Sequence, residues 1–161
     1  MSTEINPVVN IEEAEEQKTP SAPNRLKRVK LIVAYDGTNY HGWQVQPNGE
    51  TIEGVLNRTL SSLLGEKIIV TGASRTDAGV HSMGNVAVFD TKSRIPAEKI
   101  SYALNQRLPE DIVVQKSEEV PADFHPRHCD SRKTYEYRIL NRRFPDPTRR
   151  LYSFFYHYPL D

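Results

Sequence analysis

The chain has 161 residues, enough for one domain with a hydrophobic core, and its 21 basic and 21 acidic side chains give a formal net charge of zero. Its single cysteine, Cys129, excludes an internal disulfide and a zinc site built from cysteines. No stretch approaches the run of about 18 apolar residues that a membrane helix needs, and the first residues lack the order of a signal peptide, so we expect a cytoplasmic protein without membrane contact.

The zero net charge hides an uneven distribution along the chain. Residues 1–27 hold five acids against three bases, contain Pro20 and Pro23 and show no hydrophobic period, so we predict a disordered acidic leader there. Residues 125–150 hold eight Lys or Arg against three acids, a local excess of five positive charges. Such a run is most often a solvated basic face, and a surface that holds nucleic-acid phosphates is the alternative.

The ordered part of the chain is predicted to begin with a strand and a helix. Apolar residues alternate over 28–35, as in a largely buried strand, and Asp36-Gly37 is typical of the turn that ends it. Apolar residues recur at helical spacing over 52–64. Thr51 is a plausible N-cap for this helix, and Gly65 is expected to end it.

Four further elements complete a domain that extends over 28–161. They are two short strands, a second helix and a fourth strand, predicted over 67–71, 85–91, 96–108 and 112–115. This βαββαβ order is the ferredoxin-like plan of an α+β domain with an antiparallel sheet. An extra C-terminal strand is predicted over 133–140, and the aromatic tail 152–158 is expected to pair beyond it.

The loop predicted over 72–84 contains the string Arg75-Thr76-Asp77-Ala78-Gly79-Val80-His81. A guanidinium near Asp77 favours the ionised carboxylate, and a carboxylate held in a glycine-containing loop can act as a nucleophile or a base. The alternative is that Asp77 only caps a turn formed by Ala78 and Gly79. Local chemistry alone favours this structural role, since most loop aspartates only accept hydrogen bonds from backbone N–H groups.

Two tyrosines, Tyr135 and Tyr137, alternate with polar residues in the extra strand and stand among Arg132, Lys133 and Arg138. Aromatic residues interleaved with basic ones suit stacking on an unpaired base and binding of its phosphates. The alternative is that the tyrosines belong to a stripe of core residues.

A metal or nucleotide cofactor is not expected. The segment His125-Pro126-Arg127-His128-Cys129 superficially suggests a metal site, but zinc needs four ligands and the sequence has no second His/Cys cluster. The sequence also lacks a glycine-rich phosphate-binding loop of either nucleotide-binding kind.

The string around Asp77 resembles the signature of the tRNA pseudouridine synthase A family, and three further blocks agree in order and spacing. These blocks are Tyr35-Asp36-Gly37 with Tyr40, Gly42, Trp43, Gln44 and Gln46; Asn105, Leu108, Pro109 and Asp111-Ile112; and Phe124-His125-Pro126-Arg127 with Lys133-Thr134-Tyr135-Glu136-Tyr137. The resemblance covers residues 28–161 and implies the N-terminal, catalytic half of a two-domain protein. The second domain is then absent from this chain.

The function that the resemblance implies is isomerisation of uridine to pseudouridine at positions 38 to 40 of tRNA, in the anticodon stem-loop, without a cofactor. The resemblance implies that Asp77 is the nucleophile. Whether it attacks the sugar or the base stays open. The target base must leave its stack to be reached. The resemblance assigns Arg75 to this step and Tyr135 to packing on the uracil, and it implies a homodimer.

Basic residues of the C-terminal segment are expected to hold tRNA phosphates: Arg127, Arg132, Lys133, Arg138, Arg142 and Arg143. Two alternatives to an active enzyme stay open. The chain is either a non-catalytic module that keeps the tRNA-binding surface, or a fragment whose apolar inter-domain face makes it unstable.

Overall fold

The computed structural model describes residues 25–161, so the acidic leader predicted over 1–27 lies outside the described residues except for its last three positions. Strand β1 (Lys27–Tyr35) begins at the last of these positions. The Lys27 side chain is buried, and its ammonium donates a hydrogen bond to the Ile95 carbonyl. The first strand therefore begins one residue earlier than predicted.

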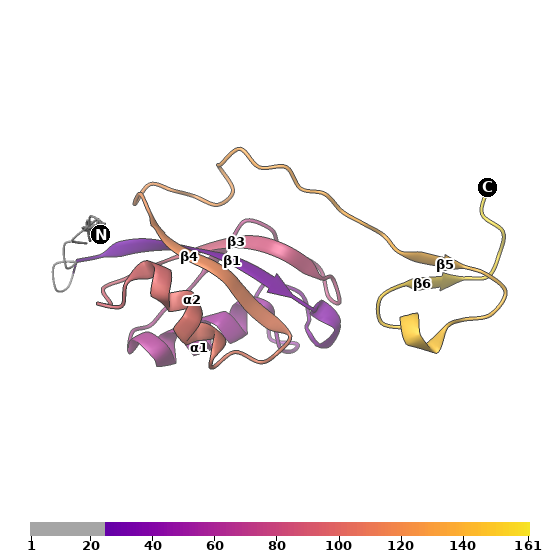
Figure 1. Ribbon diagram of the computed structural model, residues 1–161, viewed down its shortest axis with the longest axis horizontal. Coiled ribbons are helices and arrows are strands. Elements are labelled where there is room, and N and C mark those ends of the chain that lie inside the picture. The colour runs from indigo at the N-terminus through magenta and orange to yellow at the C-terminus, as the bar shows by residue number, and fades with distance from the viewer. Residues whose placement is uncertain (1–24) are drawn as a thin grey trace, which may run out of the picture.

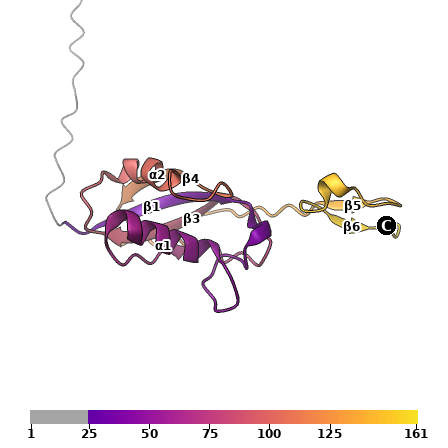
Figure 2. The same cartoon turned by 90° about the horizontal axis from the view of Figure 1, so that it is seen from below.

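The elements after β1 are η1 (Gly37–Asn39), α1 (Ile52–Leu64), β2 (Thr71–Gly72), β3 (Ser82–Thr91), α2 (Ala97–Asn105) and β4 (Ile112–Val120). The four strands form one antiparallel sheet in the order β2-β3-β1-β4. Both helices lie on the same face of this sheet (Figures 1 and 2). The predicted α+β domain of the ferredoxin-like βαββαβ type is confirmed.

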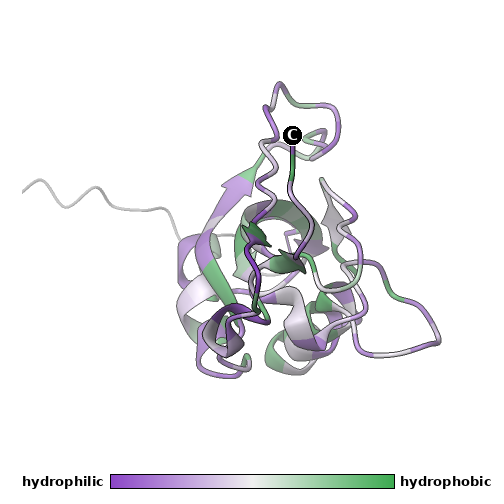
Figure 3. Cartoon of the chain, turned by 90° about the vertical axis from the view of Figure 1, so that its right-hand side faces the viewer, coloured by the Kyte–Doolittle hydropathy of each residue, from purple (hydrophilic) through white to green (hydrophobic). Residues whose placement is uncertain are grey.

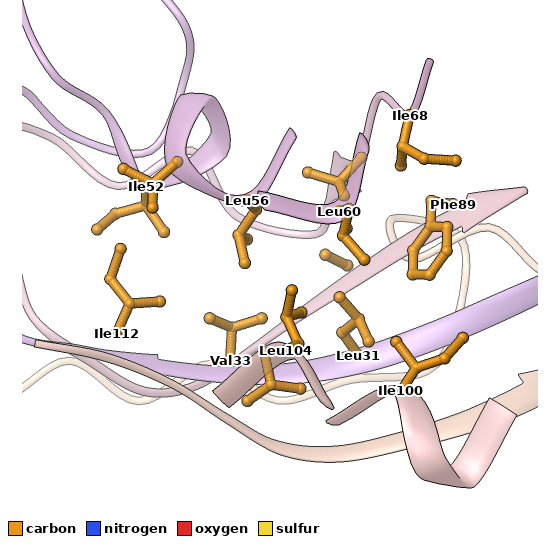
Figure 4. Close-up of a cluster of buried hydrophobic side chains, with 14 of the residues drawn as sticks. Leu31, Val33, Ile52, Leu56, Leu60, Ile68, Phe89, Ile100, Leu104 and Ile112 are labelled. Atoms are coloured by element: carbon orange, nitrogen blue, oxygen red, sulfur yellow. The ribbon is translucent and has the colours of Figure 1, made fainter. Parts of the chain in front are cut away.

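The core lies between the central strand β1 and the two helices. Burial alternates along β1, with Leu31 and Val33 fully buried on the helix-facing side. Figure 4 shows Leu56 from α1 and Ile100 and Leu104 from α2 gathered around these two side chains. Burial of one such side chain contributes about 1.5–3 kcal/mol to folding. This core fixes the end of β1, from which the candidate site is built.

The first helix begins and ends where the sequence predicts. The Thr51 hydroxyl accepts a hydrogen bond from the Gly54 N–H at 3.1 Å, which caps the first turn. Gly65 ends α1 in the left-handed conformation. The second helix ends at Asn105, three residues before the predicted end, and the Asn105 amide bonds both the N–H and the carbonyl of Val114 in β4.

The prediction of a strand over 67–71 is wrong in extent. Of this range only Thr71 belongs to a paired strand, β2, which continues to Gly72 and pairs with β3. The N–H groups of Ile68 and Val70 instead donate to side chains of α1, those of Ser61 and Asn57. These residues keep the alternating burial of a strand without its ladder, and this alternation is what the sequence pattern detected.

Strands β3 and β4 are longer than predicted. β3 begins at Ser82 rather than at residue 85, and β4 continues to Val120, past the predicted end at 115. In the added part of β4, Glu118 lies opposite Lys30 of β1 and forms an ion pair with it at 2.9 Å. Hydrophobic alternation does not reveal a strand whose cross-strand pairs are ionic.

The strand predicted over 133–140 is mostly absent. Residues 131–138 are exposed and have no regular structure, because no strand of the described residues lies beside them to form a ladder. Only β5 (Ile139–Asn141) forms, and it pairs in parallel with β6 (Phe154–Tyr156) across η2 (Pro147–Arg149), which places the aromatic tail beside it as expected. Figure 1 shows the connector, residues 121–138, leading this pair away from the four-stranded sheet.

Candidate active site

Asp77 is the first residue of a tight turn, residues 77–80, that we call the Asp77 turn. The Val80 N–H donates to the Asp77 carbonyl at 3.1 Å, and Gly79 has a φ of +77°. This left-handed conformation is the one that glycine adopts without a Cβ penalty at the third position of such a turn. The predicted turn at Ala78-Gly79 is confirmed, and the Asp77 side chain is exposed at its start.

The backbone just before Asp77 is held by two aromatic residues, one at the end of β1 and one in the segment after η1. The Trp43 N–H donates to the Thr76 carbonyl at 3.0 Å, and the Tyr35 hydroxyl shares a hydrogen bond of 2.6 Å with the Thr76 hydroxyl. Tyr35 and Trp43 are both buried in the core. Because their positions are fixed by packing, they fix the position of Thr76 and of the residue that follows it.

Asn85 anchors the beginning of the loop and was missed by the sequence analysis. Its amide accepts a hydrogen bond from the Ser74 N–H at 3.2 Å and donates one to the Ser74 carbonyl at 2.9 Å. Asn85 is buried in β3 opposite Val33. A polar residue on the core-facing side of a strand is the signal that could have found it, since buried amides need partners.

The backbone after Asp77 rests on η1. The Gly79 N–H donates to the Tyr40 carbonyl at 3.3 Å. Gly37 packs so closely on Val80 that a Cβ added at Gly37 would lie 2.1 Å from the Val80 carbonyl oxygen. The Asp77 turn is therefore held from both sides, by the core on one and by η1 on the other.

Asp36 organises η1. Its carboxylate accepts hydrogen bonds from the Thr38 hydroxyl at 2.6 Å and the Thr38 N–H at 3.0 Å, and from the Tyr152 hydroxyl at 2.8 Å. These bonds, chiefly that from the Thr38 hydroxyl, lower the pKa of Asp36 to about 2. The Tyr152 contact also ties the C-terminal segment to the end of β1.

We expect the stabilising contribution of the Asp36 carboxylate to be lost as the pH falls from about 4 toward 2. The folded state lowers the pKa of this carboxyl below its ordinary value of 3.8, so its stabilising contribution is present above that value and is lost as it becomes protonated. Urea unfolding across this pH range checks the prediction, with Asp36→Asn expected to have a shallower pH dependence. Thr38→Ala removes the bond from the Thr38 hydroxyl, so its pH dependence should lie between those of the parent protein and Asp36→Asn. Identical pH dependences for all three proteins would contradict the prediction.

Arg75 and Asp77 do not contact each other as the sequence suggested. Both side chains are exposed, and neither forms a hydrogen bond or an ion pair with another residue in the range 25–161. The carboxylate and the guanidinium thus both face solvent from one short loop, where a ligand can reach them.

Two basic residues of the connector lie against the loop that carries Asp77. Arg127 Nε donates to the Gly72 carbonyl at 3.1 Å, and Lys133 Nζ donates to the Ala73 carbonyl at 3.2 Å. These carbonyls belong to the point where β2 leads into the loop. The fold therefore brings Arg127 and Lys133, predicted from sequence alone to bind phosphates, to the same side of the domain as Asp77.

Tyr135 also lies on this side of the domain. The pKa of Tyr35, whose hydroxyl contacts Thr76, is raised chiefly by burial and in smaller part by the proximity of Tyr135. The Tyr135 and Tyr137 side chains are 62% and 86% exposed, so the alternative that they form a core stripe is wrong. Exposed aromatic rings are available for stacking.

Among the described residues, the other predicted phosphate-binding residues form no hydrogen bond or ion pair with the loop that carries Asp77. Arg132 is exposed. Each of the remaining three contacts a residue close to it in the sequence: Arg138 pairs with Glu136, Arg142 pairs with Asp146, and Arg143 lies over the Phe144 ring.

The short strands β5 and β6, which follow the connector, carry hydrophobic residues. Figure 3 shows them in green, viewed from the β5–β6 end.

His125 and His128 come together, with ring centroids 4.4 Å apart. Within residues 25–161, however, no group of three or more His, Cys, Asp or Glu side chains is placed to hold a metal ion. The same range contains no helix that is long and apolar enough to cross a membrane.

Comparison with known proteins shows which family has this arrangement. The sequence profile of the family described as tRNA pseudouridine synthase matches residues 31–128, which include the whole loop around Asp77. The chain belongs to the tRNA pseudouridine synthase family. The resemblance inferred from the string around Asp77 is thereby confirmed.

Curated relatives in this family match most of the chain. The tRNA pseudouridine synthase A of Thermoanaerobacter sp. (strain X514) is 49% identical over 136 residues, which cover 84% of this chain and 56% of the relative. That of Ruminiclostridium cellulolyticum is 53% identical over 116 residues, covering 72% and 47%. That of Halalkalibacterium halodurans is 44% identical over 137 residues, covering 84% and 52%. The chain spans about half the length of the tRNA pseudouridine synthases it matches.

Proposed function

We propose that this chain contributes the catalytic Asp77 to an enzyme that isomerises uridine to pseudouridine at positions 38 to 40 of tRNA, in the anticodon stem-loop. The observation that carries the proposal is an exposed Asp77 carboxylate, on a turn whose backbone is held from both sides. A nucleophile must be accessible to the substrate and fixed in position, and Asp77 meets both requirements, since its side chain is exposed and the backbone of its turn is held.

The proposed reaction needs no external electrons or cofactor. The bond between ribose C1′ and uracil N1 breaks, the uracil rotates, C5 bonds to C1′, the C5 proton leaves to solvent, and N1 takes up a proton from solvent. Asp77 acts as the nucleophile by forming a temporary covalent bond, either to C1′ or to an atom of the uracil ring. This bond breaks again when the product forms. Both routes are compatible with an exposed carboxylate.

Arg75 and Tyr135 are proposed to hold the extracted uridine. A base that leaves its stack loses a few kcal/mol of stacking and pairing, and the enzyme must grip the base or fill the vacancy. The exposed Arg75 guanidinium, two residues before Asp77, is suited to this role because its planar cation can stack on bases. The exposed Tyr135 ring is proposed to pack on the uracil.

We further infer that residues 28–161 form the N-terminal half of a two-domain, homodimeric, cytoplasmic enzyme, whose second domain completes the pocket. The length of the relatives supports this proposal. So do the connector and the residues that follow it, where Tyr137, Phe144 and Phe154 are each at least two-thirds exposed. Exposed aromatic side chains gathered along one segment are typical of an interaction site.

The test uses the chain alone and the chain joined to the remaining part of the Thermoanaerobacter relative. Each protein is incubated with unmodified tRNA, and pseudouridine is mapped by chemical labelling and primer extension. Stops in the anticodon stem-loop support the proposal. Tight tRNA binding by both proteins without product would instead favour the alternative of a non-catalytic tRNA-binding module.

Arg142 and Arg143 are expected to contribute to tRNA affinity through phosphates. Each phosphate contact releases counterions, so replacing both residues by glutamine should lower the slope of log affinity against log salt by roughly 1.5. Filter binding of tRNA across a range of salt concentrations measures this slope. Arg107→Gln, beyond the end of α2, is the control. An unchanged slope in the double variant would show that these arginines do not contact phosphate.

A further inference from the structure

One residue beside the Asp77 turn has no role in the proposed chemistry, and this residue is His81. The Gly37 N–H donates to His81 Nδ1 at 3.0 Å. Together with the bond from the Gly79 N–H to the Tyr40 carbonyl and the packing of Val80 on Gly37, this bond joins the end of the turn to η1. It is the one contact of the three that depends on a side-chain hydrogen bond.

The Gly37 bond also determines which ring nitrogen of His81 carries the proton. A backbone N–H needs an acceptor, so Nδ1 must keep its lone pair and the ring proton must be on Nε2. Asp36 Oδ1 lies 3.2 Å from the same Nδ1 and would attract a proton there. That oxygen already accepts from the N–H and the hydroxyl of Thr38, and a proton on Nδ1 would leave the Gly37 N–H without its acceptor.

Tyr152 holds the imidazole in this orientation. Its ring centroid lies 5.3 Å from that of His81, and its hydroxyl is fixed by the bond to Asp36. The His81 side chain is 39% exposed and lies outside the hydrophobic core. His81 therefore contacts η1 and Tyr152 rather than the core. We expect loss of these contacts to change the position of the Asp77 turn more than the stability of the core.

We propose that neutral His81, with the proton on Nε2, is a positioning residue that fixes the Asp77 carboxylate relative to the bound uridine. This inference rests on the proposed role of Asp77. His81 touches neither substrate nor reacting atoms and acts through Gly37 and the Asp77 turn. Without the Nδ1 acceptor, the turn is held to η1 by fewer contacts and the carboxylate samples positions away from the target atom.

The first test is spectroscopic and needs no enzymatic activity. NMR of the labelled imidazole nitrogens in the 161-residue chain at neutral pH is expected to show Nδ1 without a proton and Nε2 protonated. The Gly37 amide signal should move in His81→Ala. A proton on Nδ1, or a Gly37 amide that is unaffected by the substitution, would overturn the proposal.

The second test separates positioning from binding in the joined protein described above. His81→Ala is expected to lower kcat roughly tenfold to a hundredfold with KM for tRNA unchanged, because misplacement affects the chemical step. His81→Asn keeps an acceptor near the position of Nδ1 and should restore most of the activity. His81→Gln carries its amide farther from Gly37 and should not.

The control for this test is His157→Ala, whose ring packs against those of its neighbours Phe155 and Tyr158. It should match the parent protein. Parental kcat in His81→Ala, or equal rescue by asparagine and glutamine, would overturn the positioning role. If Asp77→Asn is inactive and His81→Ala is fully active, only this inference fails. If Asp77→Asn is itself fully active, the proposed function fails.

Discussion

Replacing Asp77 by asparagine is expected to abolish pseudouridine formation while leaving folding and tRNA affinity unchanged. The two side chains have the same shape, and the carboxylate has no hydrogen bond or ion pair among the described residues, so the free energy of unfolding should change by less than about 0.5 kcal/mol. The neutral amide cannot replace the carboxylate as a nucleophile. Removal of a nucleophile lowers kcat by roughly 10⁴- to 10⁶-fold in other enzymes.

The measurement is single-turnover product mapping on the joined protein, with tRNA affinity and urea unfolding followed in parallel. Asp130→Asn, an exposed aspartate of the connector, is the matched control and should behave as the parent protein. Asp77→Glu is a second informative variant, because it keeps the charge but moves the carboxylate outward by one methylene. A glutamate as active as the parent would argue against a fixed nucleophile.

Replacing Gly42 by alanine is expected to damage both the stability of the domain and the position of Asp77. Gly42 has a φ of +81°, and a Cβ at this position would lie 2.6 Å from the Thr76 carbonyl oxygen and 3.2 Å from the Asp77 carbonyl carbon. The backbone conformation alone costs a residue with a Cβ about 1–2 kcal/mol. The clash with a packed backbone adds about 1–3 kcal/mol, so the free energy of unfolding should fall by roughly 2–5 kcal/mol.

Urea unfolding measures this loss, and Gly65→Ala is its control. Gly65 has a φ of +65° but no atom within 4 Å of an added Cβ, so alanine there suffers the backbone strain without the clash. The Gly42 variant should therefore lose clearly more stability than the Gly65 variant. It should also lose activity at saturating tRNA, because the part of the backbone that must move carries Asp77. Equal losses in the two variants would show that the loop yields to the added methyl group.

The parts of the fold that were predictable from sequence are those where one local pattern carries the whole signal. The alternation along β1 and the helical spacing of α1 are set by burial against a single core, and Thr51 and Gly65 act within one turn of the helix. The ends of the later strands depend on partners distant in the sequence. Glu118, for example, lies beyond the predicted end of its strand, and only its pairing with Lys30 shows that the strand continues.

The tyrosines of the connector illustrate a different limit. An alternation such as that of Tyr135 and Tyr137 is the same in a core strand and in an exposed segment, and only the presence of a neighbouring strand distinguishes them. In the described residues no such strand is present, and both side chains are exposed. Sequence periodicity could not have decided this point.

The candidate site was located by its motif, but the two interpretations of Asp77 were less opposed than local chemistry suggested. The turn at Ala78-Gly79 exists, and Asp77 stands at its first position with an exposed carboxylate. The turn is thus the means by which the carboxylate is presented. The bond that joins His81 to this turn's surroundings could not be assigned from sequence, because its partner is a backbone N–H group of another segment. For Asn85 the sequence offers a polar residue on the core-facing side of a strand, but not its partner, Ser74.

The most direct measurement of the proposed role of Asp77 uses tRNA labelled with tritium at uridine C5. Because the C5 hydrogen leaves when C5 bonds to the ribose, tritium release reports the isomerisation itself. In a single turnover, the joined protein should release tritium from the anticodon stem-loop, and Asp77→Asn should release none above background while binding the same amount of tRNA. Release by Asp77→Asn at the parental rate would contradict the assignment of Asp77 as the nucleophile.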